Sequence, residues 1–317
     1  MVCFNTFTSS AILSFAASAI AGPVSPKAFV THPITKKASR TRRVSPSTGS
    51  FFGTEYIDTV TVGNATVLKQ SIGVASSSTG FEGVDGIIGF GPADLTEDTV
   101  SGVTTVATFM DNLYSQHSIP TEVLGVSLAP ESGSDDDDAN GELTFGGTDP
   151  SKYTGNIVYT PRSTSSLVTP YWGVAISAIT YGSTSLGSGS GIVDTGTTLI
   201  YSGRQKNCTP LNFAYTKFLS ASGGETDSIT GLAKFTTKPT STFSLTIGGT
   251  TFPLTPSQYL VPTAQYANLG ISGSAYYSWI NDGGSSGVDI IIGQKFLENY
   301  YSVFDTTNNR IGFATAL

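Results

Sequence analysis

The sequence repeats one short pattern, Asp-x-Ile-Ile-Gly, at residues 85–89 and again at residues 289–293. A run of β-branched residues that stops at a glycine predicts a buried strand followed by a turn. Two such strands, about two hundred residues apart, predict that the chain is built from two related halves. The repeat therefore favours two lobes, each with one of these strands in its core.

The amino-acid composition fits a two-lobed β protein. With 317 residues the chain can bury two cores, and 36 glycines with only 12% charged residues are typical of a turn-rich β fold. Six of the 16 Lys and Arg residues lie in residues 1–43, which hold no acidic residue, so residues 44–317 carry 10 basic against 23 acidic side chains, a formal charge of −13. Such an acidic body argues against a nucleic-acid partner.

An aspartate follows another apolar strand at residues 191–200, Gly-Ile-Val-Asp-Thr-Gly-Thr-Thr-Leu-Ile. Ile192 and Val193 predict the end of a buried strand, and Gly196 allows a tight turn directly after it. Asp194 is therefore expected at the tip of a strand, where hydroxyl and amide groups can orient its carboxylate. An ordinary Asx-turn without a catalytic role is the alternative for these residues alone.

Further motifs extend the pattern around this aspartate. They are Val-Asp-Thr-Gly-Thr-Thr at 193–198, Ile-Ile-Gly-x-x-Phe-Leu at 291–297, Tyr-Ser-Val-Phe-Asp at 301–305 and Arg-Ile-Gly-Phe-Ala at 310–314. Together they resemble the C-terminal lobe of pepsin-like aspartic proteases, most closely the secreted fungal, polyporopepsin-like members. The resemblance implies an all-β, bilobal pepsin-like fold and an endopeptidase that hydrolyses protein or peptide substrates at acidic pH, with no cofactor and no metal.

The resemblance also assigns roles to residues. In this family two aspartates, one from each lobe, share a proton: one activates a water while the other donates a hydrogen bond to the substrate carbonyl. Asp194 would be one member of this dyad, and Thr195 would lock its loop to the partner loop across the lobes. The residues expected to contact substrate are Gly196, Thr197 and Thr198 near the aspartate, and Thr48, Gly49 and Ser50 in the flap.

The partner aspartate is missing from the expected place. Residues 1–190 contain no Asp-Thr-Gly, and the nearest match, Asp58-Thr59-Val60, lies inside an alternating strand after the flap. Relatives have Tyr-Gly at the flap where this chain has Pro46-Ser47. The N-terminal lobe is therefore expected to be truncated, starting at the flap, and the chain is expected to be inactive as written.

The sequence is expected to divide into four parts. An apolar run at 11–17 precedes an Ala-x-Ala pattern, which predicts a secretory signal peptide and an extracellular protein, with a disordered or buried apolar terminus as the alternative. A basic segment follows, a solvated linker by default or a propeptide remnant by resemblance. The parts are a signal peptide at 1–21, the basic segment at 22–45, a partial N-terminal lobe at 46–164 and a C-terminal lobe at 165–317.

Local patterns predict the main elements. No run is long enough to span a membrane. Residues 202–212 are polar and interrupt the family pattern, as a surface loop or as a wrongly translated piece of gene. The predicted elements are strands at 49–56, 58–62, 71–75 and around Ile87-Ile88, helices at 105–116 and 213–219, a hairpin at 243–252, and a solvated four-aspartate tip at 135–138.

Other hydrolytic schemes fit less well. Gly-Gly-Ser-Ser-Gly at 283–287 has the letters of a nucleophile elbow but precedes a strand, and His32 and His117 are the only histidines. Three hypotheses remain: an incomplete form of an active, monomeric acid protease, a non-catalytic peptide-binding relative, and a homodimer that pairs two copies of Asp194.

Overall fold

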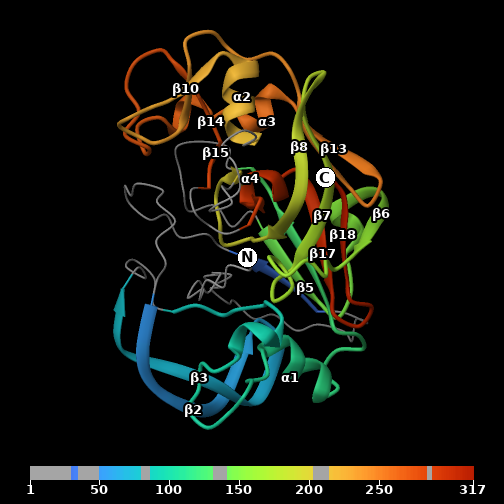
Figure 1. The fold of residues 1–317 in the computed structure, drawn as a ribbon. Helices are drawn as coiled ribbons and strands as arrows, with labels where there is room; N and C mark the ends of the chain where they lie inside the picture. Colours follow the sequence, from blue (N-terminus) through green and yellow to red (C-terminus); the bar gives the residue numbers. More distant parts are fainter. Residues whose placement is uncertain (1–29, 35–49, 80–85, 131–140, 203–213, 284–287) are drawn as a thin grey trace, which may run out of the picture.

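The computed structural model describes residues 30–34, 50–79, 86–130, 141–202, 214–283 and 288–317. Regular structure in these ranges is mostly β-strand, arranged in four sheets, which confirms the predicted all-β class (Figure 1). None of the helices in these ranges is long and apolar enough to cross a membrane. We call the described residues up to 164 the N-terminal half and those from 165 onward the C-terminal half.

An antiparallel six-stranded sheet joins the two halves, because it contains strands from both. The last two strands of the chain are inserted between strands of the N-terminal half, so that Val303 pairs with Gly125 on one side and with Gly312 on the other. Its order is β1 (Val30–Ile34), β5 (Gly141–Phe145), β4 (Val123–Leu128), β17 (Tyr300–Asp305), β18 (Arg310–Ala316) and β6 (Tyr153–Pro161).

Strand β1 lies in the segment that we expected to be a solvated linker. Its residues pair with β5, from Val30 opposite Phe145 to Ile34 opposite Gly141. The prediction missed it because the basic composition of residues 22–45 hides a short β-branched stretch, Val-Thr-His-Pro-Ile. Part of this segment is therefore integrated in the sheet.

A seven-stranded sheet forms the core of the C-terminal half. Within this sheet, strand β16 pairs in parallel with β8 on one side and antiparallel with β9 on the other. The predicted hairpin is confirmed, with Gly248 and Gly249 at positive φ in its turn. The sheet order is β13 (Thr250–Leu254), β12 (Phe243–Ile247), β7 (Gly173–Tyr181), β8 (Thr184–Val193), β16 (Ile290–Ile292), β9 (Ile200–Ser202) and β15 (Ile280–Asp282).

A smaller layer closes the far end of the C-terminal half (Figure 1). It contains the three-stranded sheet β10 (Gly224–Thr226), β11 (Ala233–Phe235) and β14 (Tyr276–Ser278), with helices α2 (Ala214–Ser222) and α3 (Pro256–Tyr259). Phe218 of α2 makes edge-on ring contacts with Tyr181, Phe235, Phe243 and Tyr259. This packing explains why the predicted helix forms after the polar insert.

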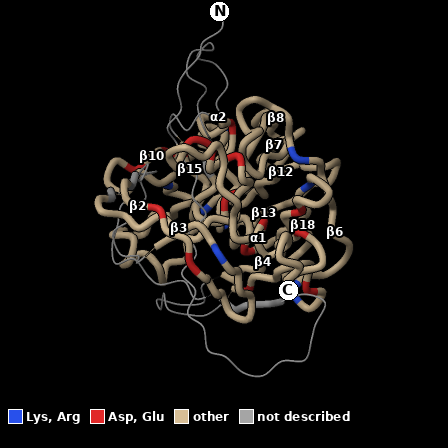
Figure 2. Tube along the Cα trace, turned by 90° about the horizontal axis from the view of Figure 1, so that it is seen from below, with Lys and Arg blue, Asp and Glu red and all other residues tan. Residues whose placement is uncertain are grey.

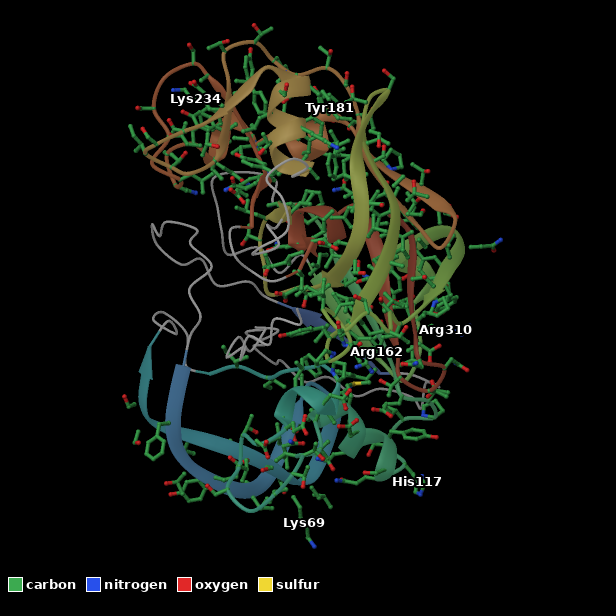
Figure 3. All side chains as sticks on the ribbon, viewed as in Figure 1. Lys69, His117, Arg162, Tyr181, Lys234 and Arg310 are labelled. Carbon is green, nitrogen blue, oxygen red and sulfur yellow. The ribbon has the colours of Figure 1, made fainter. Side chains whose placement is uncertain are left out.

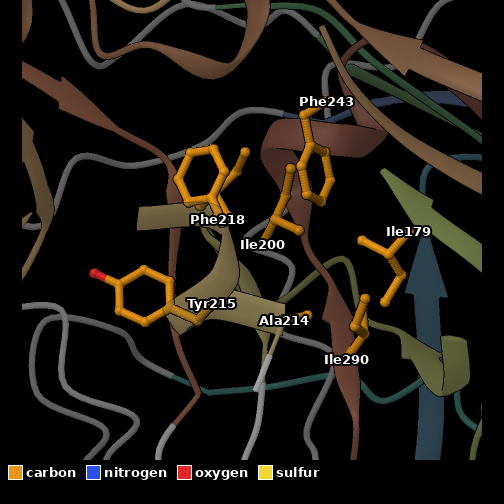
Figure 4. A pocket seen from close by; sticks show the side chains of 8 residues that line it. Ile179, Ile200, Ala214, Tyr215, Phe218, Phe243 and Ile290 are labelled. Carbon is orange, nitrogen blue, oxygen red and sulfur yellow. The ribbon is translucent and has the colours of Figure 1, made fainter. Parts of the chain in front are cut away.

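A small apolar cavity remains beneath α2 (Figure 4). Its walls are entirely aliphatic or aromatic, which suits a packing defect of the core better than a ligand site. The lining residues are Ile179, Ile200, Ala214, Tyr215, Phe218, Phe243, Ile280 and Ile290.

A long hairpin of β2 (Ser50–Val62) and β3 (Ala65–Thr79) stands at the opposite end of the molecule (Figure 1). We expected strands at 49–56 and 58–62, but they form one strand, because shifts of register at Phe52/Gly53 and Asp58/Val60 let it continue past the irregularities. Helix α1 (Phe109–Ser115) packs on β3. It begins later than predicted because Thr108 and Asp111 form a capping box.

The two copies of the repeated pattern differ in structure. Residues 289–293 contribute β16, as predicted, whereas residues 86–90 form no strand, so the strand predicted around Ile87-Ile88 is wrong. In the C-terminal half, β16 is held between β8 and β9. Within the described N-terminal half, no strand pairs with Ile87 or Ile88, which accounts for the difference.

Several sequence predictions lie outside the described residues. They concern the signal peptide at 1–21, Pro46 to Gly49 of the flap, the four-aspartate tip at 135–138, and most of the insert at 202–212 and of the Gly/Ser stretch at 283–287. His117 is exposed, as expected for a surface residue, and has a positive φ of 56° directly after α1. Three short 3₁₀ turns complete the fold, at Ala93–Thr96, Pro150–Lys152 and Thr263–Gln265.

Candidate active site

Asp194 follows the last residue of β8, as the sequence predicts. The backbone N–H of Val193 donates to the carbonyl of Trp172 at 2.9 Å, and that of Asp194 donates to the carbonyl of Ile292 at 3.0 Å. These bonds fix the strand on both sides up to the aspartate. The carboxylate is 7% exposed, so its environment is set by the protein rather than by bulk water.

Two donors hold the carboxylate from within its own loop. The backbone N–H of Gly196 donates to Oδ1 at 2.9 Å, and the hydroxyl of Thr197 donates to Oδ2 at 2.6 Å. Three of the predicted site residues are thus in direct contact. Burial raises the pKa of Asp194, and the bonds from Thr197 and Gly196 oppose that rise because they favour the ionised form.

Helix α4 (Gln294–Leu297) supports the loop from behind. The backbone N–H groups of Gln294 and Lys295 donate to the carbonyls of Thr197 and Thr198, at 2.6 and 3.1 Å. Gly293 makes this contact possible, since a β-carbon there would stand 2.5 Å from the Thr197 carbonyl oxygen. Gln294 and Lys295 stand at the x positions of the Ile-Ile-Gly-x-x-Phe-Leu motif, so the motif gave no indication of this role.

A buried ion pair lies in the same helix. Lys295 Nζ is 2.8 Å from Glu298 Oε1, with both side chains 5% exposed, and it lies 4.9 Å from the ring centre of Trp279. Charges this deeply buried are tolerated only when paired. The pair links Lys295, whose backbone N–H donates to the loop, to the C-cap residue of α4.

One hydroxyl of the loop has no partner. Thr195 is 7% exposed, and its Oγ1 makes no hydrogen bond within the described ranges. Buried hydroxyls are nearly always bonded, because an unmade bond costs about 1–3 kcal/mol. This is the residue that the family resemblance assigned to the contact with the second loop.

The predicted flap residues are not brought to Asp194 by the described structure. Thr48 and Gly49 lie outside it, and only the backbone of Ser50 is described, at the start of β2. The strand runs away into the hairpin at the far end of the molecule (Figure 1). Thr198 lies near the aspartate, half-buried, and contributes its carbonyl to α4.

The residues that follow the first Ile-Ile-Gly copy line a small pocket together with Asp194. Gly91 and Leu95 line this pocket together with Trp172 and Asp194. The indole N–H of Trp172 also donates to the carbonyl of Phe90 at 3.0 Å. The N-terminal half therefore approaches the aspartate with the residues that directly follow its copy of the repeat.

Arg162 ties the two halves together near this pocket (Figure 3). Its guanidinium is 3.1 Å from Asp94 Oδ2 and donates to the carbonyls of Thr169 and Tyr171, at 2.5 and 2.9 Å. It also lies 5.9 Å from the ring centre of Trp172. These contacts hold the linker between β6 and β7 against the N-terminal half.

The site offers acid or base chemistry from one carboxyl group. No second carboxylate affects the pKa of Asp194 in the described part of the chain. Across the same residues, no group of His, Cys, Asp and Glu is arranged to hold a metal ion.

The comparisons with known proteins agree with this geometry. The model of the family described as eukaryotic aspartyl protease matches residues 32–316. Polyporopepsin from Irpex lacteus is 45% identical over 299 residues, covering 91% of this chain and 85% of the relative. Gastricsin from Cavia porcellus is 34% identical over 281 residues, which cover 85% of this chain but 64% of the relative.

A solved structure gives the same result for the fold. The crystal structure of the aspartic proteinase from Irpex lacteus superimposes with a TM-score of 0.78 at 41% identity, covering 96% of this chain and 88% of that chain. The fold is therefore pepsin-like, as predicted from the motifs. With the strand, the acidic loop and the supporting helix all in place, this chain belongs to the eukaryotic aspartyl proteases, a family of aspartic endopeptidases.

Proposed function

We propose that this chain is an incomplete form of a secreted acid endopeptidase and that, as written, it does not cleave peptide bonds. The observation that carries the proposal is Asp194 itself: a carboxyl group oriented by Gly196 and Thr197 in a family loop, with no second Asp-Thr-Gly among the 317 residues.

The chemistry requires two acids at once. Two neighbouring carboxyls repel each other when both are ionised, so one keeps its proton while the other is charged. A lone carboxyl is either protonated or ionised, and it cannot activate water and polarise the carbonyl in the same transition state. A positioned acid or base typically contributes about 10²–10⁴-fold, so the chain is expected to lose at least that factor.

The unpartnered hydroxyl of Thr195 supports the same proposal. In the family this residue would contact the loop of the other aspartate, and here its Oγ1 is buried without a partner among the described residues. The missing piece is therefore a loop, rather than one substituted residue. Genomic DNA before codon 46 and at codons 202–212 bears on this directly: an in-frame exon with Asp-Thr-Gly-Ser and a removable intron would identify the chain as a mispredicted or spliced form.

Charge and the leader sequence favour an acidic extracellular setting and a monomer that acts on proteins or peptides. Asp and Glu outnumber Lys and Arg along the folded part (Figure 2), and protonation at low pH would reduce their repulsion. The apolar run at 11–17 with its Ala-x-Ala pattern supports secretion.

The test is proteolysis by purified protein. We expect the full chain and its Asp194→Asn variant to show the same background on denatured protein between pH 3 and 5. Activity that is linear in protein concentration and lost in the variant would contradict the proposal, because it would require a second acid within the chain. Activity that rises with the square of the concentration would favour the homodimer.

A further inference from the structure

The β2–β3 hairpin carries a short polar triplet at its tip. The sequence contains two Asn-x-Thr triplets, Asn64-Ala65-Thr66 and Asn207-Cys208-Thr209. Such a triplet, with any residue except proline in the middle, is the acceptor pattern for N-linked glycosylation of secreted proteins. The second triplet lies outside the described residues, whereas the first joins the end of the turn to the start of β3.

Asn64 stands at the corner of a tight turn. Val62 pairs with Ala65, so Gly63 and Asn64 form a two-residue hairpin loop. Gly63 has a positive φ of 59°, as expected for the first loop position of a type II′ turn. The side chain of Asn64 is exposed, so its amide is accessible from solvent in the folded chain.

The tip of the hairpin is nevertheless firmly held. Val62, Ala65 and Val67 are 4%, 3% and 0% exposed and belong to the main core cluster. Gln116, at the end of α1, bonds both backbone groups of Leu68: its Oε1 accepts from the N–H at 2.9 Å, and its Nε2 donates to the carbonyl at 2.8 Å. The exposure of Asn64 is therefore a fixed property of the turn.

The outer face of the tip is polar. Thr66 lies opposite Thr61, both are exposed, and their hydroxyl oxygens are 2.9 Å apart. An asparagine in a turn and a pair of threonines across two strands each have a structural explanation. A modification of Asn64 needs free space as well, and this geometry supplies it, because the buried side chain of Ala65 points inward while Asn64 and Thr66 face solvent.

We infer that Asn64 is an acceptor site for an N-linked oligosaccharide. The inference rests on the secretion in the proposed function, because the reaction occurs only in chains that enter the secretory pathway. The donor is an oligosaccharide joined through a diphosphate to a membrane lipid. A bond forms between Nδ2 of Asn64 and the anomeric carbon of the first sugar, the bond from that carbon to the diphosphate oxygen breaks, and the lipid diphosphate takes up the amide proton. The transferase of the host catalyses this transfer, which involves no oxidation or reduction.

The test expresses the full chain in a eukaryotic host that glycosylates secreted proteins. One sample has the natural N-terminus, and the other has a heterologous secretory leader ahead of the full chain. Cell extract and medium are both denatured and treated with a glycan-removing amidase in heavy-oxygen water, which converts a glycosylated asparagine to a labelled aspartate. Peptide mass spectrometry reads residues 64 and 207 separately. Because the protein is denatured first, variants that fold badly are still scored.

Four substitutions separate the triplet from the fold. Asn64→Gln removes the acceptor amide, and Thr66→Ala removes the hydroxyl of the triplet while keeping the asparagine. Thr66→Ser keeps the triplet. Thr61→Ala is the matched control, because it removes the same bond between hydroxyls as Thr66→Ala but leaves the triplet intact.

We expect label at residue 64 in the unchanged chain, in Thr66→Ser and in Thr61→Ala, and its loss in Asn64→Gln and Thr66→Ala. An unlabelled residue 64 in molecules whose heterologous leader has been cleaved overturns the inference. Label that persists in Thr66→Ala also overturns it, because it would come from spontaneous deamidation. Label behind the heterologous leader but not behind the natural N-terminus supports the site and contradicts the proposed secretion.

Discussion

Gly293 faces the carbonyl of Thr197 so closely that a β-carbon on Gly293 would lie 2.5 Å from that oxygen. The turn that carries Asp194 is therefore pressed against the strand end that supports it. Only glycine, which has no β-carbon, fits at position 293. This contact distinguishes the second copy of the repeat from the first, where a β-carbon on Gly89 meets no described atom within 4 Å.

The first prediction compares these two glycines. Gly293→Ala is expected to lower the free energy of unfolding by about 1–3 kcal/mol or more, because either the turn or β16 must move. Gly89→Ala is expected to change it by no more than about 0.5 kcal/mol, because the added methyl meets no described atom within 4 Å. Urea unfolding of both variants measures the difference. Equal costs for the two substitutions would show that the close approach of Gly293 to the Thr197 carbonyl is not what sets the cost.

The sequence predicted the C-terminal half well, because its motifs are local and complete. Residues 191–200 give both the strand and the acidic turn, and the Gly-Gly pair at 248 and 249 gives the hairpin. The sequence could not show that β17 and β18 complete a sheet of the N-terminal half, since such pairing depends on contacts between distant segments. The strand predicted around Ile87-Ile88 is wrong for a related reason: an apolar pattern indicates a strand but not whether a neighbouring strand pairs with it, and none does among the described residues.

Within the site, the direct contacts of Asp194 could be predicted from the sequence, whereas the hydrogen bonds from α4 to its loop could not. Gly196 and Thr197 lie within three residues of the aspartate, so turn chemistry brings them together. The N–H groups of Gln294 and Lys295 come from about one hundred residues later along the chain. The family motif at 291–297 contains both residues, but the bonds come from backbone N–H groups, so the residue types do not predict them.

The second prediction concerns the proton on Asp194. Thr197→Val removes the hydroxyl that donates to Oδ2 at 2.6 Å, and since this bond favours the ionised form, the pKa of Asp194 should rise further. Carbon-13 NMR of labelled aspartate, assigned with Asp194→Asn, measures it. Thr195→Val is the matched control, because the Thr195 hydroxyl has no described partner. A pKa that stays constant in Thr197→Val would show that burial alone sets it.

The third prediction concerns solubility. Exposed apolar groups on a free ribbon invite association, so the chain is expected to aggregate through β2 and β3. Replacing both Phe52 and Ile57 by lysine should raise the soluble fraction without altering the free energy of unfolding by more than about 0.5 kcal/mol, because neither side chain is buried. Ile229→Lys, at an equally exposed position of the C-terminal half, should have no such effect. An identical gain from Ile229→Lys would point to net charge as the cause.

The fourth prediction concerns the dependence of stability on pH, to which Glu122 contributes. Burial, and then a hydrogen bond with Asp111 and the charge of that residue, raise the pKa of Glu122 from 4.5 to about 8. The folded state thus holds this proton more tightly than the unfolded state. Its stabilising effect is complete below about pH 4.5 and is lost as the pH rises through about 8. Asp194 acts in the same direction, since burial raises its pKa.

Two other carboxyl groups lower the free energy of unfolding when they become protonated in strong acid. Burial raises the pKa values of Asp149 and Asp227, but hydrogen bonds from nearby backbone N–H groups and side chains, together with the charge of a neighbouring lysine, lower them by more. Their contribution is present above the ordinary value of 3.8 and is lost as the pH falls below it. The free energy of unfolding should therefore be greatest at about pH 4–5, decline toward pH 8, and decline again in stronger acid.

Glu122→Gln separates the Glu122 contribution from the rest. The amide keeps the shape of the protonated acid and can still donate to Asp111, but it cannot ionise, so the decline between pH 5 and 9 should be smaller in this variant than in the unchanged chain. Glu97→Gln removes a carboxylate from an exposed position and serves as the control. The measurement is the urea midpoint at pH 4, 5, 7 and 9 for all three proteins. Parallel curves for Glu122→Gln and the unchanged chain would show that Glu122 is already ionised beside Asp111 in acid, and the raised pKa would have to be abandoned.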